Sequence, residues 1–265
     1  LRLAKQCADE GMVLLKNNGV LPVEQSEKIA VTGPFLHEKR SHLGSWAPDY
    51  DASVLKSLHE AFLACAGKDM LVVPQLPYLW DDILPAIRQV DIVVLAFGES
   101  ARVSGENNCL TNIDFPAEQL EFVKKIKALG KKTVGVMSFG RPVAMGEAEQ
   151  YFDAILYAWQ SGSCASHSIV DIIYGRVNPS GKLPMTFPRT TGQIPIYYNY
   201  PPFFGNGMAY YGEGENYLDC RSKPMYPFGY GLSYTQFEYS ELCCENGTLT
   251  LEELKSGKKF KVSTM

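Results

Sequence analysis

The 265-residue sequence lacks several features that would indicate particular classes of protein. It contains no run of five Lys or Arg residues and carries a formal net charge of -4. The sequence therefore does not indicate the basic patch with which proteins bind the phosphate backbone of nucleic acids. Its longest apolar runs, such as 92–97, fall far short of the ~20 residues that a membrane-spanning helix needs. The sequence therefore disfavours a nucleic-acid partner and a membrane span.

Metal and cofactor motifs are also scarce. The seven cysteines are scattered without a C-x-x-C pair, and the four histidines form no H-x-x-x-H pair, so a zinc site has little to be built from. Reduced, structural thiols are the expectation, which slightly favours a cytoplasmic location, although any signal peptide would lie upstream of Leu1. The first expected strand is not followed by a G-x-G-x-x-G turn, and we expect no cofactor.

Apolar runs that alternate with helical patterns predict an α/β fold, a three-layer α/β/α sandwich with a mainly parallel sheet. We expect strands at 29–32, 70–73, 92–97, 133–138 and 154–158, and helices at 54–66, 82–89, 116–129, 142–150 and 165–174. The strands read as continuous apolar runs, as is usual when both faces of a sheet are buried.

The remaining segments define the expected domains. Residues 1–16 carry an amphipathic helical stripe without a preceding cap, and 258–265 alternate like a strand, so we expect the chain to continue in both directions. We expect the α/β sandwich in 1–190, an ordered Pro/Gly/Tyr-rich connecting segment that wraps the domain in 191–236, and an incomplete β module in 237–265.

A long loop at 98–115 follows the expected strand 92–97 and carries Glu99, Glu106 and Asp114. Ligands of open α/β sheets bind outside the carboxyl ends of the strands, where this loop begins. The loop is therefore a candidate for proton transfer by a carboxylic acid, while a solvated polar loop is the alternative.

Two other features are weaker. The stretch Gly98-Glu99-Ser100-Ala101-Arg102 lacks the closing glycine of a G-x-S-x-G nucleophile elbow, which disfavours a serine hydrolase. Trp46 follows a short loop after the first expected strand, and it is either a platform on which a sugar stacks or a partly buried loop tryptophan.

Five motifs together resemble the second domain of family 3 glycoside hydrolases. They are Gly11-Met12-Val13-Leu14-Leu15-Lys16-Asn17, Leu43-Gly44-Ser45-Trp46, Gly140-Arg141-Pro142, the stretch 178–189 (NPSGKLPMTFPR) and the stretch 226–235 (YPFGYGLSYT). The resemblance covers about residues 1–242, and the remainder of the chain looks like the start of a fibronectin-type-III-like domain.

The resemblance implies a β-glucosidase-like enzyme that hydrolyses β-linked sugars. In that family a (β/α)8 barrel supplies the aspartate nucleophile, and this domain supplies the acid/base glutamate on a loop. The triplet Ser104-Gly105-Glu106 matches that position, so Glu106 is the expected general acid/base. Trp46, Glu99 and Ser104 are the expected substrate-binding residues, although Glu99, nearer the strand end, fits loop support better.

Some positions depart from the family pattern. Cys109-Leu110 and Thr111-Asn112 stand where the family usually has Ser-Arg and Thr-Asp, which removes a cation and a carboxylate. The alternative is therefore a non-catalytic module that completes and shields a barrel, with a degenerate acid/base loop.

Overall fold

The computed structural model describes residues 1–66, 71–72, 80–199, 217–244, 248–259 and 261–264. The chain divides into two compact units, Leu1–Tyr234 and Thr235–Met265. The expected division into 1–190, 191–236 and 237–265 stays a prediction.

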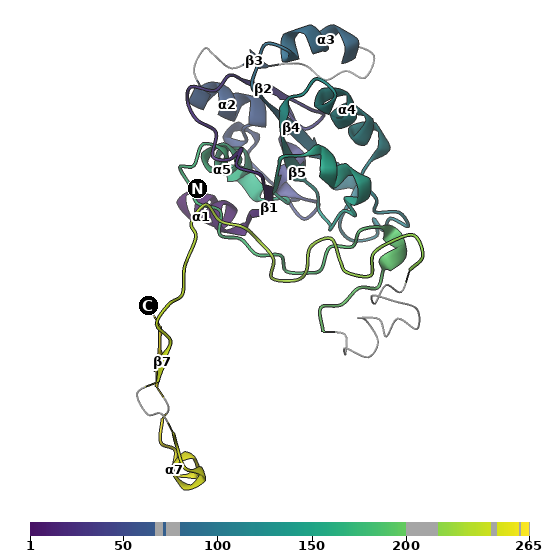
Figure 1. The fold of residues 1–265 in the computed structure, drawn as a ribbon. Helices are drawn as coiled ribbons and strands as arrows, with labels where there is room; N and C mark the ends of the chain where they lie inside the picture. Colours follow the sequence, from purple (N-terminus) through teal and green to yellow (C-terminus); the bar gives the residue numbers. More distant parts are fainter. Residues whose placement is uncertain (67–70, 73–79, 200–216, 245–247, 260, 265) are drawn as a thin grey trace. The chain divides into compact units, whose positions relative to one another are not determined.

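The first unit is built on a six-stranded sheet (Figure 1). Its strands are β1 (Val13–Asn17), β2 (Ile29–Thr32), β3 (Leu71–Val72), β4 (Ile92–Gly98), β5 (Lys132–Ser138) and β6 (Ala154–Tyr157). They lie in the order β1-β6-β5-β4-β2-β3. All neighbouring pairs are parallel except β1 with β6, so the predicted mainly parallel sheet is confirmed.

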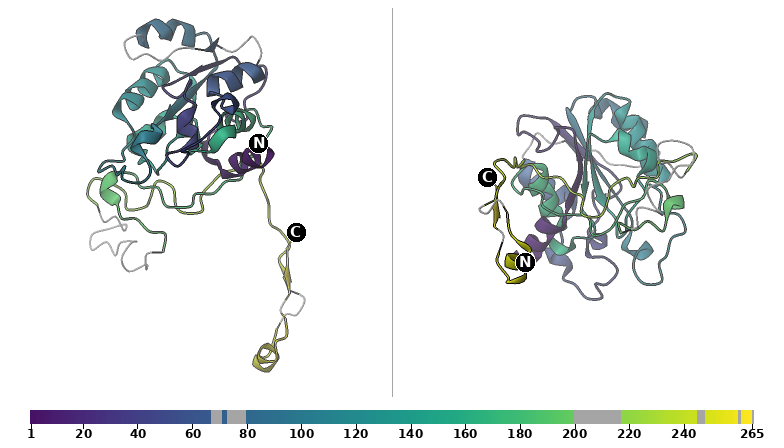
Figure 2. Two further views of the ribbon diagram at one scale, coloured as in Figure 1. Left: turned by 180° about the vertical axis from the view of Figure 1, so that it is seen from behind. Right: turned by 60° about the horizontal axis from the view of Figure 1, so that its bottom comes forward.

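Helices cover both faces of the sheet, as the views in Figures 1 and 2 show. They are α1 (Arg2–Gly11), α2 (Leu58–Ala66) and α5 (Ala165–Ile173) on one face, and α3 (Trp80–Ile87) and α4 (Ala117–Lys127) on the other. Along β4, Ile92, Val94 and Ala96 join one hydrophobic cluster, whereas Val93, Leu95 and Phe97 join the other. This confirms the three-layer sandwich.

Short 3₁₀ helices lie in the connections. They are η1 (Arg40–Leu43), η2 (Ala52–Val54), η5 (Ala101–Val103), η6 (Gly146–Tyr151), η7 (Gly162–Cys164) and η8 (Thr191–Gln193).

Two sequence-based expectations are wrong. The helix expected through residue 16 ends at Gly11, and Val13–Asn17 instead pairs antiparallel with β6 as an edge strand. The helix expected at 142–150 is replaced by η6 at its end, because Ala144 is held in an extended bridge with Asp114 and Gly146 has a φ of 46°. Of the strand expected at 70–73, Leu71–Val72 is observed, and Met70 and Val73 lie outside the described residues.

The aromatic segment that follows Asn178 packs against the sandwich. Leu183, Phe187 and Tyr226 are buried in the hydrophobic cluster on the α3/α4 face. Phe187 bridges to Tyr226, and Leu232 bridges to Leu14 of β1. These contacts attach the segment to the sandwich, the ordered connecting segment expected at 191–236 stays a prediction, and residues 200–216 lie outside the described residues.

The second unit contains a two-stranded antiparallel pair, β7 (Cys243–Cys244) with β8 (Val262–Ser263). Between them, α7 (Leu251–Lys255) begins with a capping box in which Thr250 and Glu253 exchange hydrogen bonds. The strand expected at 258–265 is thus limited to two residues among those described, and the fibronectin-type-III-like assignment stays a prediction.

Candidate functional site

The strand order places a topological switch point between β2 and β4. From β2 the chain continues to β3 on one side, and β4, β5 and β6 then follow on the other, so the strand order switches direction beside β2. Open α/β sheets bind ligands outside the carboxyl ends of the strands at such a switch point. The loops that leave β2 and β4 therefore flank the expected site.

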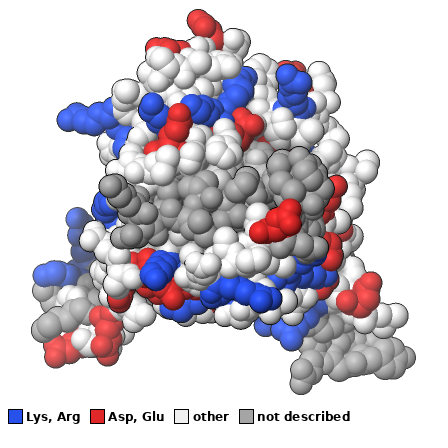
Figure 3. All heavy atoms as spheres, turned by 90° about the horizontal axis from the view of Figure 1, so that it is seen from above, with Lys and Arg blue, Asp and Glu red and all other residues white. Residues whose placement is uncertain are grey.

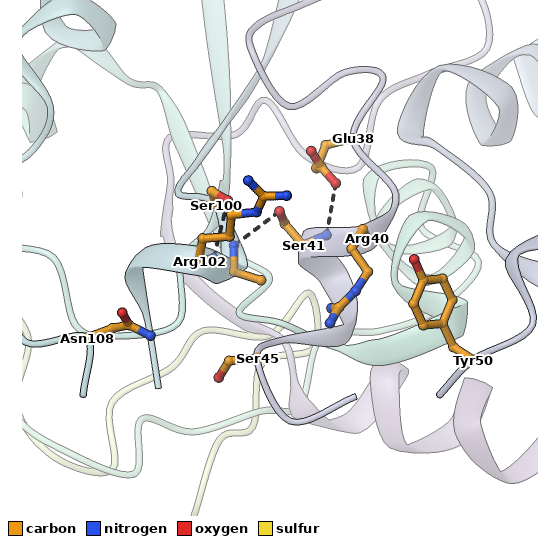
Figure 4. A pocket seen from close by; sticks show the side chains of 9 residues that line it. Glu38, Arg40, Ser41, Ser45, Tyr50, Ser100, Arg102 and Asn108 are labelled. Atoms are coloured by element: carbon orange, nitrogen blue, oxygen red, sulfur yellow. Dashed lines mark hydrogen bonds between the residues drawn. The ribbon is translucent and has the colours of Figure 1, made fainter. Parts of the chain in front are cut away.

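An open pocket of about 710 Å³ lies between these two loops (Figure 4). Its lining is polar and consists of Glu38, Arg40, Ser41, Ser45, Tyr50, Ser100, Ala101, Arg102 and Asn108. The two loops are joined here, because the Ala101 amide donates to Ser41 Oγ at 3.2 Å. The pocket is a site where polar groups of a ligand can be hydrogen-bonded.

Arg40 is held in place at this pocket. Its guanidinium donates to the carbonyl oxygens of Gly44 at 2.6 Å and Ala47 at 3.1 Å, and it lies 5.1 Å from the centroid of the Tyr50 ring. The loop that carries Trp46 is therefore closed around this guanidinium. No sequence motif assigned this role to Arg40.

Glu106 projects from a tight turn at 105–108, which is closed by a hydrogen bond from the Asn108 amide to the Gly105 carbonyl oxygen at 3.2 Å. Gly105 and Asn107 have φ values of 96° and 61°, so two of the four residues adopt left-handed backbone. Glu106 is exposed, and no hydrogen bond or ion pair of its carboxylate occurs within the described part of the chain. The carboxyl group is therefore free to meet a ligand.

Trp46 lies beside the same turn. A Cβ atom on Gly105 would clash with Ser45 Oγ and lie 3.9 Å from Trp46 Nε1, so the turn lies against Ser45 and next to Trp46. The Trp46 side chain is 75% exposed. This tryptophan is therefore not part of the core, and stacking on a sugar stays a prediction.

Ser104 is placed differently from the other predicted residues. Its side chain is buried, and its hydroxyl accepts a hydrogen bond from Gln160 Nε2 at 3.0 Å. Its carbonyl oxygen accepts from Asn108 Nδ2 at 3.2 Å. The observed contacts make Ser104 an anchor of the turn, and its predicted contact with substrate stays a prediction.

Glu99 is also turned toward the protein. Its carboxylate accepts from the Gly140 amide at 3.0 Å and from Arg141 Nε at 3.1 and 3.2 Å. The two side chains are only 11% and 17% exposed, so this ion pair is shielded from solvent. These contacts fit loop support, and the predicted contact of Glu99 with substrate stays a prediction.

His42 lies buried in η1 at the same end of the sheet. Neither of its ring nitrogens has a hydrogen-bond partner among the described residues. Burial lowers the pKa of His42 to about 4, although the charge of Glu38 acts in the opposite direction. The imidazole is therefore neutral at pH 7.

Arg141 and Gln160 contribute to the site without having been given a role from the sequence. The sequence contains Gly140-Arg141-Pro142 as a motif, but it does not show which groups Arg141 contacts. Each residue follows the carboxyl end of a strand, β5 or β6, and that position is the signal that could have found them.

Among the described residues, no helix combines the length and the apolarity of a membrane span. No cluster of three His, Cys, Asp or Glu residues there suits a metal ion. Among the described residues on the face seen in Figure 3, acidic and basic side chains are interspersed.

Known proteins with similar sequences are glycosidases. Residues 12–234 match the family described as the glycosyl hydrolase family 3 C-terminal domain. The periplasmic beta-glucosidase of Salmonella typhimurium is 35% identical over 93% of this chain and 36% of its own length. A beta-xylosidase of Formosa agariphila is 32% identical over 96% of this chain and 38% of its own length.

Solved structures agree with these sequence matches. The beta-glucosidase from Listeria innocua in complex with glucose superimposes with a TM-score of 0.82 and 34% identity. The match covers 90% of this chain and 34% of that protein. This chain therefore spans about a third of the length of these relatives.

Proposed function

This chain belongs to the C-terminal domain family of family 3 glycosyl hydrolases, and from that membership we propose that it supplies the general acid/base of a retaining β-glycosidase. The proposed substrate is a glycoside with a β-linked sugar at its non-reducing end, since the relatives include beta-glucosidases and a beta-xylosidase. The proposed partner is a (β/α)8 barrel domain, which would supply the aspartate nucleophile.

One observation carries the proposal. The Glu106 carboxylate is exposed and has no partner within the described residues, yet the turn that bears it is anchored on both sides at the switch point of the sheet. An acid that is free while its backbone is held can reach a substrate without first breaking a contact. Nearby Trp46 offers an exposed ring to the sugar.

The proposed reaction has two steps. Glu106 protonates the leaving-group oxygen while the aspartate forms a covalent glycosyl-enzyme, and Glu106 then removes a proton from the attacking water. Two inversions retain the β configuration, and the two carboxyl groups stand ~5 to 5.5 Å apart in such enzymes. This chemistry needs neither a metal nor a cofactor.

The alternative is a module that only completes a barrel. It is favoured by Cys109-Leu110, where the family usually has a cation, and by Asn112, whose side chain accepts a hydrogen bond from Thr191 Oγ1 at 3.0 Å. Under the acid/base proposal, residues 1–265 alone should not hydrolyse an aryl β-glucoside, because the nucleophile is missing. Turnover by the isolated chain that depends on Glu106 would contradict this division of labour.

The decisive experiment changes Glu106→Ala in a polypeptide that joins this chain to the barrel. Protonation matters most for poor leaving groups, so kcat/KM should fall ~10² to 10⁴-fold for an alkyl glycoside and much less for a dinitrophenyl glycoside. Added azide, which needs no general base, should restore turnover of the activated substrate and give a β-glycosyl azide. Equal losses on both substrates without azide rescue would favour the non-catalytic module.

A further inference from the structure

We propose that Arg141 is the positioning residue of the acid/base loop, because one guanidinium joins the start of that loop to the backbone on both sides of Glu106. The inference rests on the proposed function of Glu106. It concerns how the acid is held in place, and it assigns to Arg141 no contact with substrate.

The contacts of the guanidinium lie around the turn. Arg141 Nε pairs with Glu99, the first residue after β4, at 3.1 Å. The terminal nitrogen Nη2 contacts the carbonyl oxygen of Val103 and, at 3.3 Å, that of Asn108. Val103 lies two residues before the turn and Asn108 is its last residue, so Arg141 holds the backbone on both sides of Glu106.

Arg141 is itself anchored to the sheet. Its carbonyl oxygen accepts a hydrogen bond from the hydroxyl of Tyr157, the last residue of β6, at 2.5 Å. The Gly140 amide adds a bond to Glu99 at 3.0 Å. The loop that leaves β4 is thus fastened to the segment after β5 by the Arg141 side chain and the Gly140 amide, and Tyr157 joins that segment to the end of β6.

Only arginine suits this arrangement. Its planar guanidinium presents five N–H donors in a fixed geometry, so it can pair with a carboxylate and bond to two carbonyl oxygens at once. A lysine would keep the charge but could not make all three contacts together. Without the guanidinium, the side-chain bonds that remain among the described residues are those of Ser104 to Gln160 and Asn108, and that of Asn108 to the Glu106 carbonyl oxygen at 3.3 Å.

The consequence should fall on proton transfer, because Glu106 is the ionisable group on the turn. A displacement of ~1 Å in a catalytic group can lower the rate ~10²-fold. The loss of Arg141 should therefore slow mainly the hydrolysis of substrates whose leaving group must be protonated. A residue that served only folding would slow good and poor substrates alike.

The first test uses this chain without any activity. We compare Arg141→Gln, Arg141→Lys and the matched control Arg88→Gln, an exposed arginine just before the amino end of β4, by hydrogen exchange. The amides of Val103 and Asn108 should exchange roughly tenfold faster in both Arg141 variants and within about twofold of wild type in the control. Unchanged exchange in Arg141→Gln would overturn the inference, whatever Glu106 does.

The second test uses the barrel-containing polypeptide. Arg141→Gln should lower kcat about 10- to 100-fold for an alkyl glycoside and less than ~3-fold for a dinitrophenyl glycoside, with little change in KM. Arg141→Lys should behave like Arg141→Gln. Equal losses on both substrates would make Arg141 a purely structural residue and overturn the inference.

Glu106→Ala, measured in parallel, separates the two proposals. If Glu106→Ala shows the dependence on leaving group and Arg141→Gln does not, the positioning role is wrong and the acid/base role stands. If neither shows it, the acid/base role fails, and the positioning role fails with it.

Discussion

The two ends of the parallel sheet use carboxylates in different ways. At the amino ends, Asp91 accepts from the Lys28 amide at 2.9 Å, and Asp153 accepts from the Thr133 amide at 2.8 Å and from Lys127 Nζ at 2.5 Å. At the carboxyl ends, Glu99 is bound in the same way, but Glu106 has no partner among the described residues.

This difference separates stability from function. A carboxylate that bonds to the start of a neighbouring strand satisfies a backbone donor and stabilises the fold. An exposed carboxylate on a strained turn gives little stability, and left-handed residues at such places commonly mark functional sites. The comparison therefore predicts large stability effects at anchors and small ones at Glu106 and Trp46.

The largest effect is expected from the substitution Gly105→Ala, which would break the packing of the turn. The added methyl would clash with Ser45 Oγ on a backbone with a φ of 96°. We expect a loss of roughly 2–4 kcal/mol in the free energy of unfolding, measured with urea. Gly130→Ala is the control, because its φ is 73° but nothing lies within 4 Å, so it should lose only ~1 kcal/mol. Equal losses would show that the turn is not closely packed.

The next effect compares the two ends directly. Asp153→Asn should lower the free energy of unfolding by roughly 1.5–3 kcal/mol, because the ion pair with Lys127 and the charge that strengthens the bond from the Thr133 amide are lost at a part-buried position. Glu106→Gln should change it by less than ~0.5 kcal/mol, since the group is exposed and unpaired in the described structure. Comparable losses in the two variants would remove the distinction between the ends.

The pH dependence of Asp153 follows from the same contacts. Burial raises the pKa of Asp153, but the Lys127 ammonium and the Thr133 amide outweigh it, so the pKa lies below its usual value of 3.8. The stabilisation is therefore present above pH 3.8 and is lost as the pH falls through the pKa of the folded state.

His42, at the carboxyl ends of the strands, should make the free energy of unfolding depend on pH in a range above that of Asp153. Its pKa rises from about 4 in the folded state to 6.5 on unfolding, so the unfolded chain binds more protons between these values and stability falls with falling pH. We expect a loss of about 2 kcal/mol between pH 7 and pH 5. His42→Leu should reduce this loss in urea unfolding at the two pH values, and an unchanged loss would assign it to other groups.

The sequence predicts the sheet well because the signals of its strands are local. β2, β4, β5 and β6 appear as buried apolar runs close to their observed bounds. The sequence wrongly predicts helix at β1, because Met12, Leu14 and Leu15 also fit a helical stripe and the pairing of β1 with β6 depends on a distant segment. The sequence does not predict the contacts of Arg141 for the same reason, because they form only where the carboxyl ends of β4, β5 and β6 come together.

The smallest effect is expected at Trp46. Because its side chain is 75% exposed, Trp46→Ala should change the free energy of unfolding by less than ~0.5 kcal/mol. If the ring stacks on the sugar, the contact is worth about 1 kcal/mol, which corresponds to a roughly fivefold weaker Kd for a sugar lactone in the barrel-containing polypeptide. Trp46→Phe keeps an aromatic face and should recover most of the affinity. If Trp46→Ala binds the lactone as tightly as wild type, Trp46 does not stack on the sugar and only lies beside Gly105. The carboxyl ends of the strands would then present Glu106 without an aromatic side chain that binds the sugar.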